Sequence, residues 1–143
     1  MTQIATTIEQ SRYLLESGLD PKSADMVWVR YAAGGYRLEV LHRELFERIM
    51  ETDIPAWSLD ALLEVMPKEL VNDGYNKKGE QVVALAKLVI DTFVVDGRYM
   101  WRIGYKGKRR YWVKIYADNL VRAAFEMDCF LLRQCYIKKG GAK

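Results

Sequence analysis

Apolar and polar residues alternate with a period of two along three consecutive segments between residues 88 and 116. Asp96-Gly97 separates the first two segments and favours a type I′ hairpin turn, because both central residues of that turn adopt positive φ. The turn fixes a register that divides the side chains between two faces. The pairs on the predicted core face are Val94/Tyr99, Thr92/Trp101, Ile90/Ile103 and Leu88/Tyr105. The pairs on the opposite face are Phe93/Met100, Asp91/Arg102 and Val89/Gly104, with Asp91 and Arg102 forming a cross-strand ion pair.

The third segment continues this ribbon if Tyr111, Val113 and Ile115 join the core face. That register places Tyr105 opposite Tyr111 and leaves residues 106–110 as a five-residue loop. We therefore expect a three-stranded antiparallel ribbon with one buried and one exposed face. The buried face is expected to hold Tyr99, Trp101, Ile103, Val113 and Ile115. The exposed face is expected to hold Arg98, Met100, Arg102, Trp112, Lys114 and Tyr116.

Capping residues and helical periodicity predict three helices around the ribbon. The sequence from Thr7 to Gln10 has the form of a capping box, and this helix is expected to end near Ser17, before Gly18. Ser58 is the expected N-cap of a short middle helix that Pro67 ends. Asp118 is the expected N-cap of a long final helix, from residue 119 to about residue 136. Its buried stripe is expected to comprise Leu120, Ala124, Met127, Leu131 and Cys135.

The segments between these helices and the ribbon leave alternatives open. Residues 26–31 and 36–41 predict a hairpin around Gly34-Gly35, but residues 37–50 also fit one helix. We expect a strand to Leu41 followed by a helix over 43–50. Residues 68–80 indicate a polar loop, and residues 81–88 fit either a helical turn or the start of the next strand. The predicted fold class is α+β. Its antiparallel sheet (ribbon about 88–116, further hairpin 26–41) packs against N-terminal, middle and long C-terminal helices in a single domain over 1–143.

Composition places the chain among ordinary globular proteins. It has 143 residues, of which 50% are apolar and 29% charged. No apolar run approaches the roughly 18 residues that cross a bilayer, and the N-terminus lacks a signal-peptide pattern. We therefore expect no membrane partner and a cytoplasmic location. Cys129 and Cys135 are expected to be free buried thiols, and His42, the single histidine, a surface residue. No spacing of Cys, His or carboxylates indicates a metal or cofactor site.

Positive charge is concentrated in the ribbon. Residues 97–116 contain seven Lys or Arg and no Asp or Glu, whereas the whole chain carries a net charge of +3, so the other 123 residues sum to −4. Cations interleaved with aromatic rings are typical of surfaces that bind single-stranded nucleic acid. The candidate site residues are Arg98, Arg102, Lys106, Lys108, Arg109, Arg110, Trp112, Lys114 and Tyr116. The alternative interpretation is a solvated basic edge, with Trp112 covered by a helix or a partner subunit.

Several segments outside this region resemble, in the same order, small uncharacterised phage- or prophage-associated proteins of gut Bacteroidales. These segments are Thr7 to Ser11, Leu14 to Leu19, Ser23 to Met26, Ile54 to Leu59 with Met66-Pro67, and Ala123 to Met127. They cover about half of the chain, and residues 81–116 do not share the resemblance. The resemblance implies an intracellular phage-encoded accessory protein. It implies no activity and no functional residue.

Three classes of function are compatible with these patterns. Catalysis usually leaves a motif, and the chain has no P-loop, no glycine-rich βα turn and no Gly-x-Ser-x-Gly. We therefore expect a non-enzymatic structural or protein-interaction module of phage type, with an unknown protein partner or a second copy. The first alternative is a module that binds nucleic acid weakly through the basic aromatic ribbon. The second alternative is an enzyme without a recognisable motif.

Overall fold

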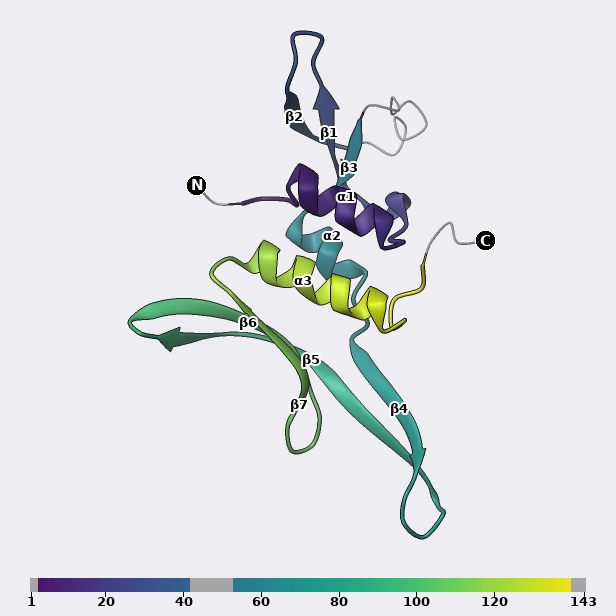
Figure 1. Cartoon of the computed structure of the whole chain (residues 1–143). Coiled ribbons are helices and arrows are strands. Elements are labelled where there is room, and N and C mark those ends of the chain that lie inside the picture. The colour runs from purple at the N-terminus through teal and green to yellow at the C-terminus, as the bar shows by residue number, and fades with distance from the viewer. Residues whose placement is uncertain (1–2, 42–52, 140–143) are drawn as a thin grey trace.

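The computed structural model describes residues 3–41 and 53–139, and its fold is α+β. Two antiparallel sheets lie on either side of a layer of helices (Figure 1). The predicted helix over 43–50 and His42 lie outside the described residues.

The predicted three-stranded ribbon is part of a four-stranded sheet with strand order β4-β5-β6-β7. Its strands are β4 (Glu69–Tyr75), β5 (Gln81–Val95), β6 (Arg98–Lys106) and β7 (Tyr111–Ala117). β5 pairs with β4 through residues 81–87 and with β6 through residues 87–95. The two hairpins therefore share β5 and point in opposite directions, so that only the row Glu69–Lys87–Lys106–Tyr111 crosses all four strands.

The predicted register of the β5–β6 hairpin is confirmed at every pair from Leu88/Tyr105 to Val95/Arg98. Asp96 and Gly97 both have positive φ, 51° and 75°, as a type I′ turn requires. Local turn chemistry therefore determines which residues share a face.

The predicted register of β7 is wrong by two residues. Tyr105 pairs with Val113 rather than with Tyr111, and the pairing shifts at a β-bulge beside Tyr105 and Lys106. The physical reason is that Trp112 is the extra residue of the bulge, which leaves Tyr111 opposite Lys106. Val113 and Ile115 keep their predicted face, whereas Tyr111 and Trp112 exchange sides.

The layer of helices lies on one face of this sheet, here called the inner face (Figure 1). The helices are α1 (Ile8–Glu16), α2 (Leu59–Glu64) and α3 (Leu120–Arg133), with a 3₁₀ turn η1 (Pro21–Ser23) after α1. The last helix, α3, packs directly against β6 and β7. The Thr7–Gln10 capping box is present, and Ser58 caps α2 as predicted. Asn119 rather than Asp118 caps α3, because its carboxamide oxygen accepts the Arg122 amide at 2.7 Å.

One cluster of buried side chains joins the three helices to the inner face. Its largest fully buried members include Trp57, Leu62, Tyr105, Met127 and Leu131. Tyr105 donates its hydroxyl to the Pro67 carbonyl at 2.6 Å. Cys129 belongs to this core, but Cys135 is exposed, because α3 ends at Arg133 and Cys135 adopts a positive φ of 61° beyond it.

The second sheet has strand order β2-β1-β3 and lies on the other side of the helices. Its strands are β1 (Met26–Arg30), β2 (Tyr36–Val40) and β3 (Ile54–Ala56). The predicted hairpin is confirmed, whereas β3 was not predicted. The polar loop predicted over 68–80 is also wrong, because Glu69–Tyr75 forms β4 by pairing with Gln81–Lys87 of β5.

Candidate interaction surface

The β5–β6 hairpin extends beyond the helices as a two-stranded ribbon, here called the arm and comprising residues 89–100 (Figure 1). β4 pairs with β5 only up to Lys87, and β7 pairs with β6 only from Trp101 onward. Therefore neither β4 nor β7 pairs with residues 89–100. No residue of the arm belongs to the hydrophobic core cluster that packs against the described helices.

Both faces of the arm carry apolar side chains. Ile90, Val94 and Tyr99 lie on the inner face, and Val94 and Tyr99 are 58% and 77% exposed. Phe93 and Met100 lie on the outer face and are half-buried, next to the exposed Val95. The prediction that Tyr99 lies in the core is therefore wrong. Alternation correctly assigned its face, but the helices do not extend over it.

The outer face of the sheet gathers cations around one aromatic ring. The Arg102 Cζ lies 5.1 Å from the centre of the Tyr111 ring, and the Nζ atoms of Lys106 and Lys114 lie 5.7 Å from it. Lys114 is also 5.7 Å from the centre of the Tyr116 ring. We call Arg102, Lys106, Tyr111, Lys114 and Tyr116 the Tyr111 cluster.

Asp91 lowers the net charge of the Tyr111 cluster. Its carboxylate accepts two hydrogen bonds from the Arg102 guanidinium, at 2.8 and 2.5 Å, as the predicted cross-strand pair. These bonds hold the pKa of Asp91 below and that of Arg102 above their usual values. Hydrogen bonds from Lys114 and then Arg102 also lower the pKa of Tyr116, against the opposing effect of burial. The exposed Lys106 and Lys114 are therefore the cations best placed for an anionic ligand.

Trp112 is half-buried and packs against the hydrophobic core rather than joining the other candidate residues on the outer face. A Cβ on Gly107 would lie 2.5 Å from its Nε1, so the indole covers that glycine. Because of the bulge, Tyr111 rather than Trp112 lies on the outer face with the cations. Gly104 is the residue in the sequence that could have indicated this arrangement, because an isolated glycine within a strand often marks a β-bulge or the close approach of another group to the backbone.

The remaining candidate residues lie apart from the Tyr111 cluster. Lys108, Arg109 and Arg110 are exposed in the loop between β6 and β7, which the Gly107 amide closes by donating to the Arg110 carbonyl at 2.9 Å. Arg98 lies near the arm's turn, beside a groove of about 700 Å³. That groove is lined by Phe93, Val95, Asp96, Arg98, Met100 and Tyr116.

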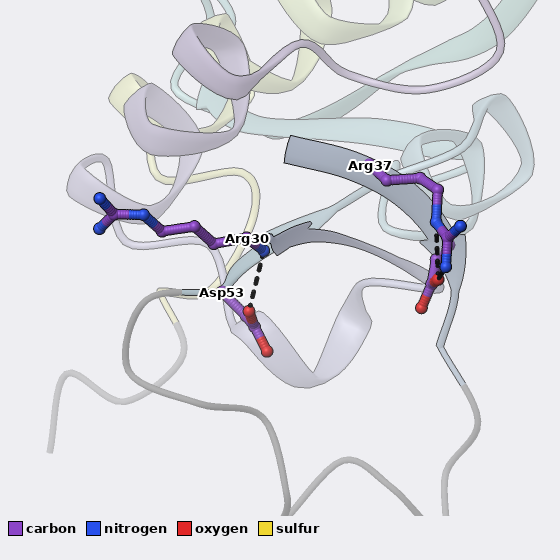
Figure 2. A network of polar contacts seen from close by, with 4 residues as sticks. Arg30, Arg37 and Asp53 are labelled. Carbon is purple, nitrogen blue, oxygen red and sulfur yellow. Dashed lines mark hydrogen bonds and ion pairs between the residues drawn. The ribbon is translucent and has the colours of Figure 1, made fainter. Parts of the chain in front are cut away.

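A smaller polar network on the three-stranded sheet has a structural role (Figure 2). The Arg30 amide donates to Asp53 Oδ1 at 3.4 Å, linking β1 to the residue before β3. The Arg37 guanidinium pairs with Glu39 on the same strand. This hydrogen-bonded pairing, together with Tyr31, raises the Arg37 pKa.

Asp128 is the other titratable group in an unusual setting. It is fully buried in α3, and neither carboxylate oxygen has a hydrogen-bond partner. Burial raises its pKa well above the usual value. Burial and then Asp128 raise the pKa of the neighbouring Cys129 thiol to about 12. Within residues 3–41 and 53–139, no group of three His, Cys, Asp or Glu side chains is arranged to hold a metal ion.

Comparison with known proteins adds no functional assignment, because no protein-family profile, curated protein or solved structure matches this chain. None of the described helices is long and apolar enough to cross a membrane.

Proposed function

We propose that this protein is a non-enzymatic structural or protein-interaction module whose arm is the contact element. The observation that carries the proposal is the arm's exposure of apolar side chains on both faces, with Tyr99 77% and Val94 58% exposed. A two-stranded hairpin is only marginally stable by itself in water, and exposed apolar patches of this kind mark protein interfaces. A partner that covers the arm removes this apolar area from water.

We base the wider proposal on the sequence. The resemblance to phage- or prophage-associated proteins supports an intracellular, phage-encoded accessory component acting in the bacterial cytoplasm. A structural component of that kind needs contact surfaces rather than a catalytic site. The arm meets that need.

Site-specific photocrosslinking tests the proposal. A photoreactive amino acid is placed at Tyr99 in cells that make the chain, and the matched control carries it at Tyr31, on the turn of the β1–β2 hairpin. We expect a discrete protein adduct from Tyr99 and none from Tyr31. The absence of any protein adduct at Tyr99, with the chain folded, contradicts the proposal.

The second candidate function is weak binding of single-stranded nucleic acid, and the Tyr111 cluster favours it. A ring with three cations within 6 Å offers a stacking platform next to groups that pair with phosphates. Asp91 and Glu69 lie on the same face, so this face is less uniformly basic than residues 97–116 of the sequence. The salt dependence of binding separates this function from apolar association.

A further inference from the structure

The arm has an unpaired β edge on the side away from β6. The Leu88 amide donates to the Lys68 carbonyl at 2.9 Å, so even-numbered residues of β5 direct their backbone groups to the β4 side. Beyond Leu88 no described strand accompanies β5 on that side. Ile90, Thr92 and Val94 therefore present their amides and carbonyls at an open edge, which is a template for another strand.

We infer that this edge pairs with the same edge of a second copy of the chain, antiparallel about a two-fold axis at Thr92. The inference rests on the proposed function and specifies its partner. With the axis at Thr92, the residue pairs are Thr92/Thr92 and Ile90/Val94, so each free backbone group on these three residues finds a partner. An axis at Asp91 pairs Val94 with Leu88, whose amide is already bonded, and an axis at Phe93 pairs Ile90 with the turn residue Asp96.

Charge supports a second copy as the occupant. The arm contains Asp91, Asp96 and Arg98 and so carries a net charge of only −1, which the adjacent Lys87 balances, so two arms repel each other little. The loop of Lys106, Lys108, Arg109 and Arg110 is strongly basic and lies outside the pairing. Lys68 occupies the edge beside Leu88, so the pairing ends at Ile90/Val94 and brings Asp96 of the second copy next to the exposed Lys68, a favourable pair of charges.

The side chains are equally self-complementary. Antiparallel pairing about one residue matches positions of the same parity, so inner faces join inner faces. Val94 then packs against Ile90 of the second copy, and Asp91 faces Phe93 rather than another carboxylate. Two exposed apolar arms become a continuous sheet with one isologous interface.

Disulfide trapping in the full chain tests the register. Cys135 is replaced by Ser because it is exposed, while the buried Cys129 is kept. Facing residues in an antiparallel pair have Cα atoms about 4.5–5.5 Å apart, within disulfide reach. Under mild oxidation, Thr92→Cys is expected to form a covalent dimer at least about tenfold faster than the exposed control Val40→Cys, because pairing raises the local concentration. Ile90→Cys and Val94→Cys are expected to cross-link when mixed and not when alone.

Sedimentation of the unmodified chain over a concentration series completes the test. We expect a reversible monomer–dimer equilibrium that Val94→Lys shifts to monomer and Val40→Lys leaves unchanged. A dimer in which Thr92→Cys cross-links no faster than Val40→Cys overturns the inference but leaves the proposed function, since another surface is then in contact. A chain that stays monomeric overturns the inference as well. In that case a Tyr99 adduct with a different protein maintains the proposed function, and the absence of any adduct removes both.

Discussion

The Tyr111 ring lies directly over Gly104 on the neighbouring strand. A Cβ on Gly104 would be 2.7 Å from Tyr111 Cδ1 and 2.8 Å from the Val113 carbonyl oxygen. The absence of a side chain at Gly104 therefore leaves room for the ring over which Arg102, Lys106 and Lys114 lie. The basic face depends on this glycine as much as on its charged residues.

Gly104→Ala is expected to destabilise the protein by about 1–3 kcal/mol, because the added methyl group overpacks the sheet against a backbone oxygen that cannot move away. Urea unfolding measures the change. The matched control is Gly74→Ala in β4, where a Cβ would meet nothing within 4 Å. An equal effect of the two substitutions contradicts the close packing of Tyr111 on Gly104.

The sequence predicts part of this arrangement because some of its determinants are local. Asp96-Gly97 specifies one turn geometry, and that turn alone sets the register of β5 and β6. The bulge at Trp112 depends on how an indole packs against the core beside Gly107, which the period-two alternation does not encode. The predicted exposed face therefore included Tyr116 correctly but named Trp112 where the structure places Tyr111.

Two further differences have non-local causes. β4 contains Asn72, Asp73 and Gly74, which favour turns, and it is a strand because β5 supplies its hydrogen-bond partners. Alternation assigned Tyr99 to the inner face, but alternation cannot show how far the helices extend over that face. Sequence patterns thus predicted which face of the sheet each side chain lies on, but not which part of that face the helices cover.

Ser58→Ala is expected to lower the free energy of unfolding by about 0.5–2 kcal/mol through loss of the N-cap of α2. The Ser58 hydroxyl accepts the Ala61 amide at 3.3 Å and donates to the Asp25 carboxylate. Denaturant unfolding measures the loss, and Ser58→Thr, which keeps a hydroxyl, is expected to restore most of it. An unchanged midpoint in Ser58→Ala means that other groups satisfy the helix end.

Asp128 is expected to make stability depend on pH. Its folded pKa is raised by burial above an unfolded value of about 3.9, so the folded chain keeps a proton that the unfolded chain has lost. Stability then falls as pH rises between the two pKa values, by up to about 1.4 kcal/mol per pH unit. Asp128→Asn does not titrate and removes this contribution. Urea unfolding from acidic to neutral pH checks the difference, and identical slopes in the two proteins contradict it.

The second candidate function predicts separable effects on binding to single-stranded nucleic acid. Arg109→Glu with Arg110→Glu is expected to weaken binding to all sequences and to reduce the salt slope by about 1.4, because fewer counterions are released. Tyr111→Ala is expected to cost about 1–3 kcal/mol with the slope nearly unchanged, because it removes a stacking surface. Trp112→Phe is the control, since the indole packs against the core. Fluorescence anisotropy with labelled oligonucleotides at two salt concentrations measures both the affinity and its salt dependence. An absence of binding at low salt contradicts this second function and leaves the arm as the one proposed contact surface.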